Sequence, residues 1–156
     1  VWMLAQPYGY PSILSSYAFD CPSGNSMGPP SDASGWTTAV SCAASLETAT
    51  VGSWVCEHRD PSILKMVSFR RVVAGADINH WWDNGANAIA FTRGDKGFVA
   101  INNGTSPVDT TIPTGMASGT YVDLLTGSSI VIDATGAVHL ILSSRTAIAI
   151  DTATRQ

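Results

Sequence analysis

The second half of the chain alternates apolar and polar residues with the period of two that is typical of half-buried β-strands. From about residue 88 onward, short alternating runs are separated by turns rich in Gly, Asn, Asp and Pro. The pattern predicts strands at 88–92, 97–102, 108–112, 119–125, 129–133, 137–142 and 145–150. Short strands at this spacing, with no helix among them, predict an antiparallel β-sandwich of the Greek-key type.

One helix is predicted over residues 61–73, ahead of the strands. Asp60 can cap its N-terminus, Pro61 suits its first position, and Gly75 follows its end. We expect an apolar stripe on this helix to need a partner surface. The stripe consists of Ile63, Met66, Val67 and Arg70, with Leu64 and Val73 beside them.

The N-terminal half is much less regular. Residues 12–17 predict one short buried strand, and residues 20–53 are rich in Gly, Pro, Ser, Thr and Ala with hardly any charge. A loop of that length usually serves a function or contacts another part of a protein. Residues 76–156 are large enough to fold alone, whereas residues 1–75 offer one strand and one helix. We therefore expect residues 1–75 to be the last piece of a larger α/β domain.

Two adjacent tryptophans, Trp81 and Trp82, stand where the two halves meet. Successive side chains of an extended segment point to opposite sides, so we expect one indole to face the core and the other to cover what lies beyond. Asp83-Asn84-Gly85 follows directly. We interpret Asp83 as a turn former rather than as a functional acid.

The net charge of −4 gives no basic footprint for nucleic acid, and no apolar run approaches the roughly 20 residues of a membrane span. We therefore expect neither a nucleic-acid partner nor a membrane partner. Of three cysteines, Cys42 and Cys56 flank a polar loop that a disulfide would stabilise by about 3 kcal/mol. Cys21 would then be free or paired elsewhere. These cysteines and the glycosylation sequon at Asn103 favour a secreted protein.

Candidates for chemistry are few. Glutamate occurs only at Glu47 and Glu57. Glu57 with His58 suggests either acid/base chemistry or a pair that orders the entry to the helix, and the second interpretation is favoured. His139 lies in an alternating strand, where we expect it to fill core or surface. No spacing of His, Cys and Asp indicates a metal site.

Several short motifs, in the same order and at collinear spacing over nearly the whole chain, resemble animal-type α-amylases of glycoside hydrolase family 13. Those that resemble the region around the eighth barrel strand, and the loop after it, are residues 3–11 with Pro7-Tyr8-Gly9, Ser15-Ser16-Tyr17 and Gly28-Pro29-Pro30. Those that resemble the eighth barrel helix and its lead are residues 54–59, with Glu57-His58-Arg59, and residues 66–70. Trp81-Trp82-Asp83-Asn84-Gly85 and residues 90–94 resemble the opening of the family's C-terminal β-sandwich, domain C.

The resemblance implies a mainly β chain: a Greek-key domain C at residues 76–156, preceded at 1–75 by the last strand and helix of a (β/α)8 barrel. It implies an enzyme that cleaves internal α-1,4 bonds of starch and glycogen with retention, which needs two carboxyl groups about 5–5.5 Å apart. In the family these carboxylates and the calcium ligands lie upstream of Val1. The resemblance therefore implies no catalytic residue in this chain, calcium only in the complete enzyme, and the N-terminal remainder of the barrel as partner.

The sequence departs from the family at one ligand position. Where the family has a basic ligand for an activating chloride, shortly after Pro-Tyr-Gly, this chain has Ser12, which carries no positive charge. We therefore expect no chloride site.

Exposed indoles stack on sugar rings, so the sequence offers Trp36, Trp81 and Trp82, with Trp54, as candidates for a secondary glucan site. The competing interpretation is that Trp81 and Trp82 pack the sandwich against the barrel. A different class of function also stays open, namely a non-catalytic carbohydrate-binding or interaction module. It requires exposed aromatic faces and first 75 residues that fold on their own.

Overall fold

The computed structural model describes residues 1–20 and 28–156, and the chain divides into two compact units. The first unit, which we call the sandwich unit, consists of Val1–Pro11 and Lys65–Gln156. The second, the loop unit, is Ser12–Leu64. These two units differ from the two domains predicted from the sequence, residues 1–75 and 76–156. That domain division stays a prediction.

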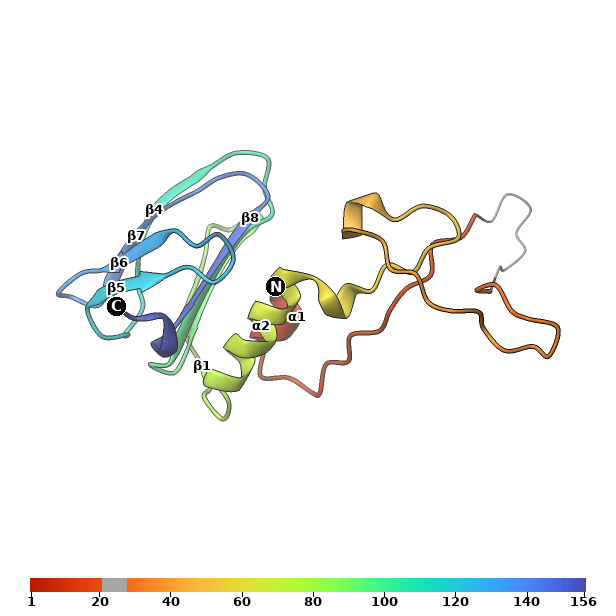
Figure 1. Cartoon of the computed structure of the whole chain (residues 1–156). Coiled ribbons are helices and arrows are strands. Elements are labelled where there is room, and N and C mark those ends of the chain that lie inside the picture. Colours follow the sequence, from red (N-terminus) through yellow and green to blue (C-terminus); the bar gives the residue numbers. More distant parts are fainter. Residues whose placement is uncertain (21–27) are drawn as a thin grey trace. The chain divides into compact units, whose positions relative to one another are not determined.

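The sandwich unit contains two antiparallel four-stranded sheets (Figure 1). One sheet has the order β1 (Ile78–Asp83), β2 (Ala88–Arg93), β3 (Gly97–Asn102), β8 (Thr146–Asp151). The other has the order β4 (Val108–Pro113), β7 (Ala137–Leu142), β6 (Ser129–Ile132), β5 (Gly119–Val122). The antiparallel sandwich predicted from the alternating pattern is confirmed. The first strand, β1, was not predicted, because its sequence carries a bulge that breaks the period of two.

The main core lies between the two sheets. Each strand contributes its alternate residues, such as Ala100 of β3, Leu140 of β7 and Ile150 of β8. On β7 the burial alternates cleanly, with Val138, Leu140 and Leu142 inside and His139 and Ile141 outside. The outer face of the β4-β7-β6-β5 sheet is therefore open, in the usual manner of an antiparallel sheet with one solvated side.

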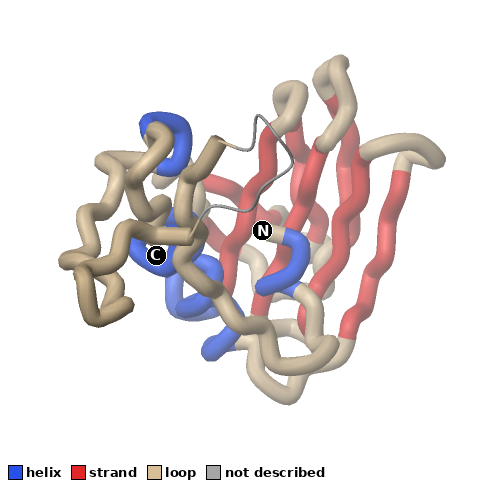
Figure 2. Tube along the Cα trace, turned by 90° about the vertical axis from the view of Figure 1, so that its right-hand side faces the viewer, coloured by secondary structure: helices blue, strands red, loops and turns tan. Residues whose placement is uncertain are grey.

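In the other sheet, β2, β3 and β8 are instead buried on both faces, whereas the edge strand β1 is largely exposed. Helices lie against one face of this sheet (Figure 2). Its second face carries Phe91, Val99 and Ala149, all fully buried. At Gly97 an added Cβ would lie 2.6 Å from Val73 Cγ1 and 2.7 Å from Phe69 Cε2. The helix end thus packs directly on the backbone of β3.

The helix α2 spans Pro61–Val72, close to the predicted 61–73. As predicted, the Asp60 carboxylate caps it, accepting from the N–H of Ser62 and of Ile63, and Gly75 follows it with a positive φ of 74°. The predicted apolar stripe was partly wrong. Its buried positions are Met66, Phe69 and Val73, whereas Leu64 is 51% exposed.

The strand predicted at residues 12–17 was also wrong. In this segment only Tyr17 makes a β-bridge, to Trp54, and Ser12 and Leu14 are exposed. The apolar start of the chain forms a one-turn helix, α1 (Trp2–Ala5), instead. A strand needs a neighbouring strand for its backbone N–H and C=O groups, and no sheet in the described part of the chain includes residues 1–17.

The loop unit has little regular structure, in line with its composition. It contains two short 3-10 turns, η1 (Leu46–Thr48) and η2 (Glu57–Arg59), and isolated bridges such as Ser31–Thr37. A disulfide joins Cys42 to Cys56, the pair suggested by the sequence. The third cysteine, Cys21, lies outside the described residues. A further 3-10 turn, η3 (Thr152–Thr154), closes the sandwich unit.

Candidate functional site

A cluster of aromatic side chains in the sandwich unit surrounds Phe91, on the face of its sheet away from the core. Trp81 stacks on the Phe91 ring, with centroids 5.9 Å apart, and Trp2 meets both rings edge-on. Trp2, Met3 and Trp81 are 45%, 49% and 50% exposed. We call these three residues the tryptophan surface. Half-exposed indoles seated on a fully buried phenylalanine form a preorganised apolar surface.

A bulge in β1 sets the directions of the two adjacent tryptophans. The register with β2 shifts between Asn79 and Trp82, and His80 adopts a positive φ of 47°. The His80 ring is held by Nδ1, which lies 3.1 Å from Thr92 Oγ1. Trp82 packs against the sandwich core, while Trp81 lies on the opposite side with Phe91. The expectation that the two indoles face opposite sides is confirmed.

Two arginines tie the N-terminal segment into the sandwich unit by their backbone contacts. Arg93 of β2 is 3% exposed and donates to the carbonyls of Ala5 (2.6 Å), Ala76 (2.9 Å) and Val73 (3.4 Å). Burial, with Arg70 nearby, lowers the pKa of the Arg93 guanidinium. Its three nitrogens each donate to a different carbonyl, which the rigid planar fork of a guanidinium allows.

Arg70 of α2 likewise binds backbone carbonyls, here those of the residues around Pro7-Tyr8-Gly9. Its guanidinium donates to the carbonyls of Gln6, Leu4 (3.3 Å) and Gly9 (2.7 Å). The side chain of Gln6 itself is an exception, because its Nε2 atom is buried without a partner among the residues that the structure describes. A buried amide without an acceptor is costly, so Gln6 marks a place where an acceptor is missing.

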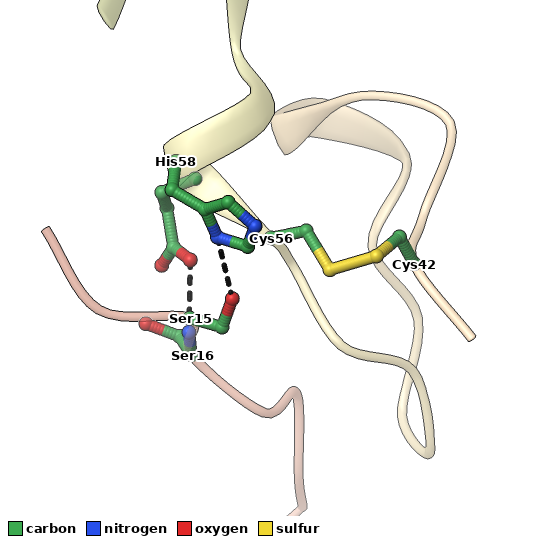
Figure 3. The surroundings of a disulfide bond; sticks show 6 residues. Ser15, Ser16, Cys42, Cys56 and His58 are labelled. Carbon is green, nitrogen blue, oxygen red and sulfur yellow. Dashed lines mark hydrogen bonds between the residues drawn. A yellow bond between two sulfur atoms is a disulfide. The ribbon is translucent and has the colours of Figure 1, made fainter. Parts of the chain in front are cut away.

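In the loop unit, Glu57 and His58 bind the segment that precedes them by some forty residues (Figure 3). The Ser16 N–H donates to Glu57 Oε2 at 2.8 Å, and Ser15 Oγ lies 3.0 Å from His58 Nδ1. The hydrogen bonds from Ser16 lower the pKa of the Glu57 carboxyl. A catalytic acid needs the opposite shift, so the geometry favours the interpretation that this pair orders the entry to α2.

A hollow of about 350 Å³ lies beside the disulfide in the same unit. It is bounded by Cys42, Ala43, Ala44, Ser45, Val55, Cys56, Arg59, Asp60 and Pro61. The Asp60 carboxylate already accepts the N–H groups that begin α2, and its hydrogen bond with Ser62 lowers the pKa of Asp60. We therefore assign the hollow no chemistry.

Trp36 is the most exposed indole, at 75%. It lies in a hairpin of the loop unit that is closed by the Ser31–Thr37 bridge. Asp32 fixes the turn, because its Oδ1 accepts from the N–H of Ser34 (2.8 Å) and of Trp36 (3.1 Å). The indole is thus held out from a well-bonded turn.

The remaining candidates from the sequence have structural or surface places. Asp83 Oδ1 accepts from the Gly85 N–H at 2.9 Å, which confirms it as a turn former. His139 is exposed on β7 and binds Asp109 at 2.8 Å. Ser12 is exposed. Within residues 1–20 and 28–156, no three His, Cys, Asp or Glu side chains gather as ligands for a metal ion. No helix of the described chain is long and apolar enough to cross a membrane.

Comparison with known proteins assigns the part of the sandwich unit that forms its two sheets. Residues 80–151 match the family model described as the C-terminal all-beta domain of α-amylase. These residues belong to that family. The match begins at His80, two residues into β1, and ends at the last residue of β8, so this α-amylase C-terminal domain contains both sheets.

The similarity to α-amylases extends beyond this domain. An α-amylase of Pecten maximus is 45% identical over 128 residues, which are 81% of this chain and 24% of that protein. The mouse pancreatic α-amylase 2a5 is 39% identical over 141 residues, 86% of this chain and 27% of that protein. The crystal structure of α-amylase I from Eisenia fetida matches 97% of this chain and 34% of its own, with a TM-score of 0.82 and 30% identity.

The chain is therefore homologous to animal α-amylases and spans about a quarter of the length of the relatives it matches. The resemblance in the sequence motifs had identified this family. It had not identified the tryptophan surface beyond Trp81, nor the two arginines and Gln6. Trp2 and Met3 stand in the apolar start of the chain, which gives no signal of an exposed surface. Arg70 had been placed on an apolar helix face, where its role as a donor to backbone carbonyls was not apparent.

Proposed function

We propose that this chain works as the C-terminal part of an α-amylase, a retaining endo-hydrolase of α-1,4-glucosidic bonds in starch and glycogen. Its direct partner is the N-terminal remainder of the catalytic barrel, and α-glucan is the substrate of the complete enzyme. The chain itself supplies structure rather than catalytic carboxylates.

The observation that carries this proposal is the tryptophan surface in a domain homologous to the C-terminal part of α-amylases. Trp2, Met3 and Trp81 leave about half of their surface exposed, although the two indoles contact the buried ring of Phe91. Burial of such side chains stabilises by about 25 cal/mol per Å² of apolar surface, so a covering partner would gain from it. The orphaned Nε2 of Gln6 lies on the same segment and gives that partner an acceptor to supply.

The carboxylates of the chain support the absence of catalysis. Retaining hydrolysis needs one carboxylate free to attack and one carboxyl free to donate a proton. Most of the acids here accept from backbone N–H groups, in turns, in caps or across the chain: Asp32, Glu57, Asp60, Asp83, Asp123, Asp133 and Asp151. Such carboxylates are structural acceptors, and we propose that the chain alone is inactive.

The same reasoning extends to ions and location. We place any calcium site in the barrel part, because no ligand group of three forms in the described part of this chain. Ser12 offers no charge for chloride, so we propose an enzyme without chloride activation. The disulfide and the pancreatic relatives support secretion.

A chimera tests the proposal. The C-terminal quarter of the Pecten maximus α-amylase is replaced by this chain, and hydrolysis of soluble starch is measured for the chimera, the truncated amylase and the chain alone. We expect activity in the chimera and none in the other two. Starch hydrolysis by the chain alone would overturn the proposal, as would a folded chimera without activity.

Two matched variants show whether the tryptophan surface makes the contact. Trp81→Asp places a charge on this surface, whereas Ile141→Asp places one on β7, where the side chain is 69% exposed on the open face of the other sheet. We expect Trp81→Asp to lower the thermal stability and activity of the chimera and Ile141→Asp to leave both nearly unchanged. Equal effects of the two variants would contradict the assignment of this surface to the barrel.

The second candidate is a carbohydrate-binding module, and Trp36 favours it. Its indole is 75% exposed on a hairpin fixed by Asp32, and α2 finds its buried partners within the chain, so a self-standing module remains a coherent alternative. Starch-granule sedimentation of the chain alone decides it. Granule binding that is abolished in Trp36→Ala and preserved in Trp81→Ala would favour the module. If the chain does not bind, the amylase proposal stands as the single candidate.

A further inference from the structure

The turn between β3 and β4 presents the one Asn-X-Ser/Thr sequon of the 156-residue sequence, Asn103-Gly104-Thr105. Both Asn103 and Thr105 are exposed. Glycosylation of asparagine requires this triplet with any residue but proline in the middle, together with an accessible side-chain amide. The turn satisfies both conditions.

The neighbouring asparagine explains why Asn103 stays available. Asn102 is 1% exposed, and its Nδ2 donates to the carbonyls of Ser106 (2.9 Å) and Ser143 (3.0 Å), while its Oδ1 accepts from the Gly104 N–H (2.9 Å). The Asn103 N–H donates to the Asn87 carbonyl at 2.9 Å. The turn is thus anchored by the Asn102 side chain and by backbone. In the described part of the chain, the Asn103 amide and the Thr105 hydroxyl make no hydrogen bond of their own.

Another turn of the same unit shows the contrast. Asn84-Gly85-Ala86 has the same first two residues but lacks the hydroxyl at the third. The Asn84 Oδ1 is also occupied, since it accepts from the N–H groups of Ala86 and Ala88, each at 3.0 Å. Only the β3–β4 turn therefore combines the triplet with a free amide.

We propose that Asn103 carries an N-linked glycan. The side-chain nitrogen of Asn103 forms a bond to C1 of the first N-acetylglucosamine of a polyisoprenyl-diphosphate oligosaccharide. The bond from C1 to the diphosphate oxygen breaks, the polyisoprenyl diphosphate leaves, and the amide loses one proton. The Cys42–Cys56 disulfide supports passage through an oxidising compartment, where such donors and their transferase are found.

This inference does not depend on the amylase proposal. The test is translation of the chain behind a cleavable signal peptide in the presence of eukaryotic microsomes, followed by gel mobility with and without peptide N-glycosidase. We expect one glycan on the parent chain. It should be lost in Asn103→Gln and in Thr105→Ala, retained in Thr105→Ser, which keeps the hydroxyl, and retained in the control Asn87→Gln, an exposed asparagine of the adjacent loop.

Transfer in microsomes acts on the emerging chain, so variants that fold poorly are still scored. A translocated parent chain with unchanged mobility would overturn the proposal, as would a glycan that survives Asn103→Gln. The second readout is glycopeptide mass spectrometry of the full-length protein purified from its source. A peptide containing unmodified Asn103 as the sole form would equally refute it.

Discussion

We expect the loss of Arg93 to lower the stability of the sandwich unit most, because its buried guanidinium is bonded to backbone carbonyls and not to a carboxylate. The guanidinium is 3% exposed and reaches the carbonyls of Ala5, Val73 and Ala76, which come from two separate stretches of chain, one at the N-terminus and one just after α2. Arg93→Met removes the donors and the charge while keeping a stem of similar length. Its effect therefore measures the hydrogen bonds rather than a cavity.

The size of the expected loss in stability depends on which hydrogen-bond donors each of the three carbonyls retains in the variant. Val73 O retains the N–H of Ala76 at 3.1 Å, so it is not orphaned. Ala5 O and Ala76 O have no other donor in the described residues, and Ala5 is fully buried. A buried group left without a partner costs about 1–3 kcal/mol, while removal of a buried charge returns part of its desolvation. We expect Arg93→Met to lower the free energy of unfolding by about 2–4 kcal/mol.

Urea denaturation followed by tryptophan fluorescence measures the change, and hydrogen exchange shows where it acts. The N–H groups of Leu4 and Ala5 are bonded to Val1 O within α1 and should exchange faster in the variant. Arg71→Met is the control, since Arg71 is an exposed arginine of α2 that makes no side-chain hydrogen bond in the described chain. A loss below about 1 kcal/mol for Arg93→Met, or one equal to that of Arg71→Met, would refute the reasoning.

Three further changes test the packing, the disulfide and the electrostatics. Gly97→Ala places a Cβ 2.6 Å from Val73 Cγ1 and should lower the free energy of unfolding by about 1–3 kcal/mol in urea titrations; an unchanged midpoint would contradict the close contact. Replacing Cys42 and Cys56 by serine opens a bridge between positions 14 apart and should destabilise the loop unit by about 3 kcal/mol, seen as faster proteolysis there with the sandwich unit unaffected. Burial raises the pKa of Asp151 above 3.8, so the stability that the protonated carboxyl contributes below pH 3.8 is lost as the pH rises through the raised pKa. Asp151→Asn should remove this loss. Urea midpoints that run parallel in the two proteins from about pH 3 to 7 would disprove this pH dependence.

The sandwich could be predicted because the alternation of apolar and polar residues along a strand follows the alternation of buried and exposed positions. On β7 the side chains alternate between core and solvent, and the sequence alternates with them. The β1 strand could not be predicted, since the bulge at His80 interrupts its period and the residue adopts a left-handed conformation. The helix α2 was found from its cap and its terminal glycine. Its buried face was misjudged because Phe69 meets the backbone of Gly97, a contact that only the fold brings together.

The candidate site was less predictable, because its residues contact partners that are far away in the sequence, and no local sequence pattern indicates such contacts. The apolar start of the chain predicts burial, yet Trp2 and Met3 are about half exposed. The segment that resembles a barrel strand has no neighbouring strand among the described residues and forms one helical turn, α1, whose Leu4 and Ala5 carbonyls accept from Arg70 and Arg93. A helix of four residues has almost no stability of its own. Its conformation therefore follows from what it touches, and pairing with the strands of a barrel would give the same residues and the Gln6 amide the partners that they lack here.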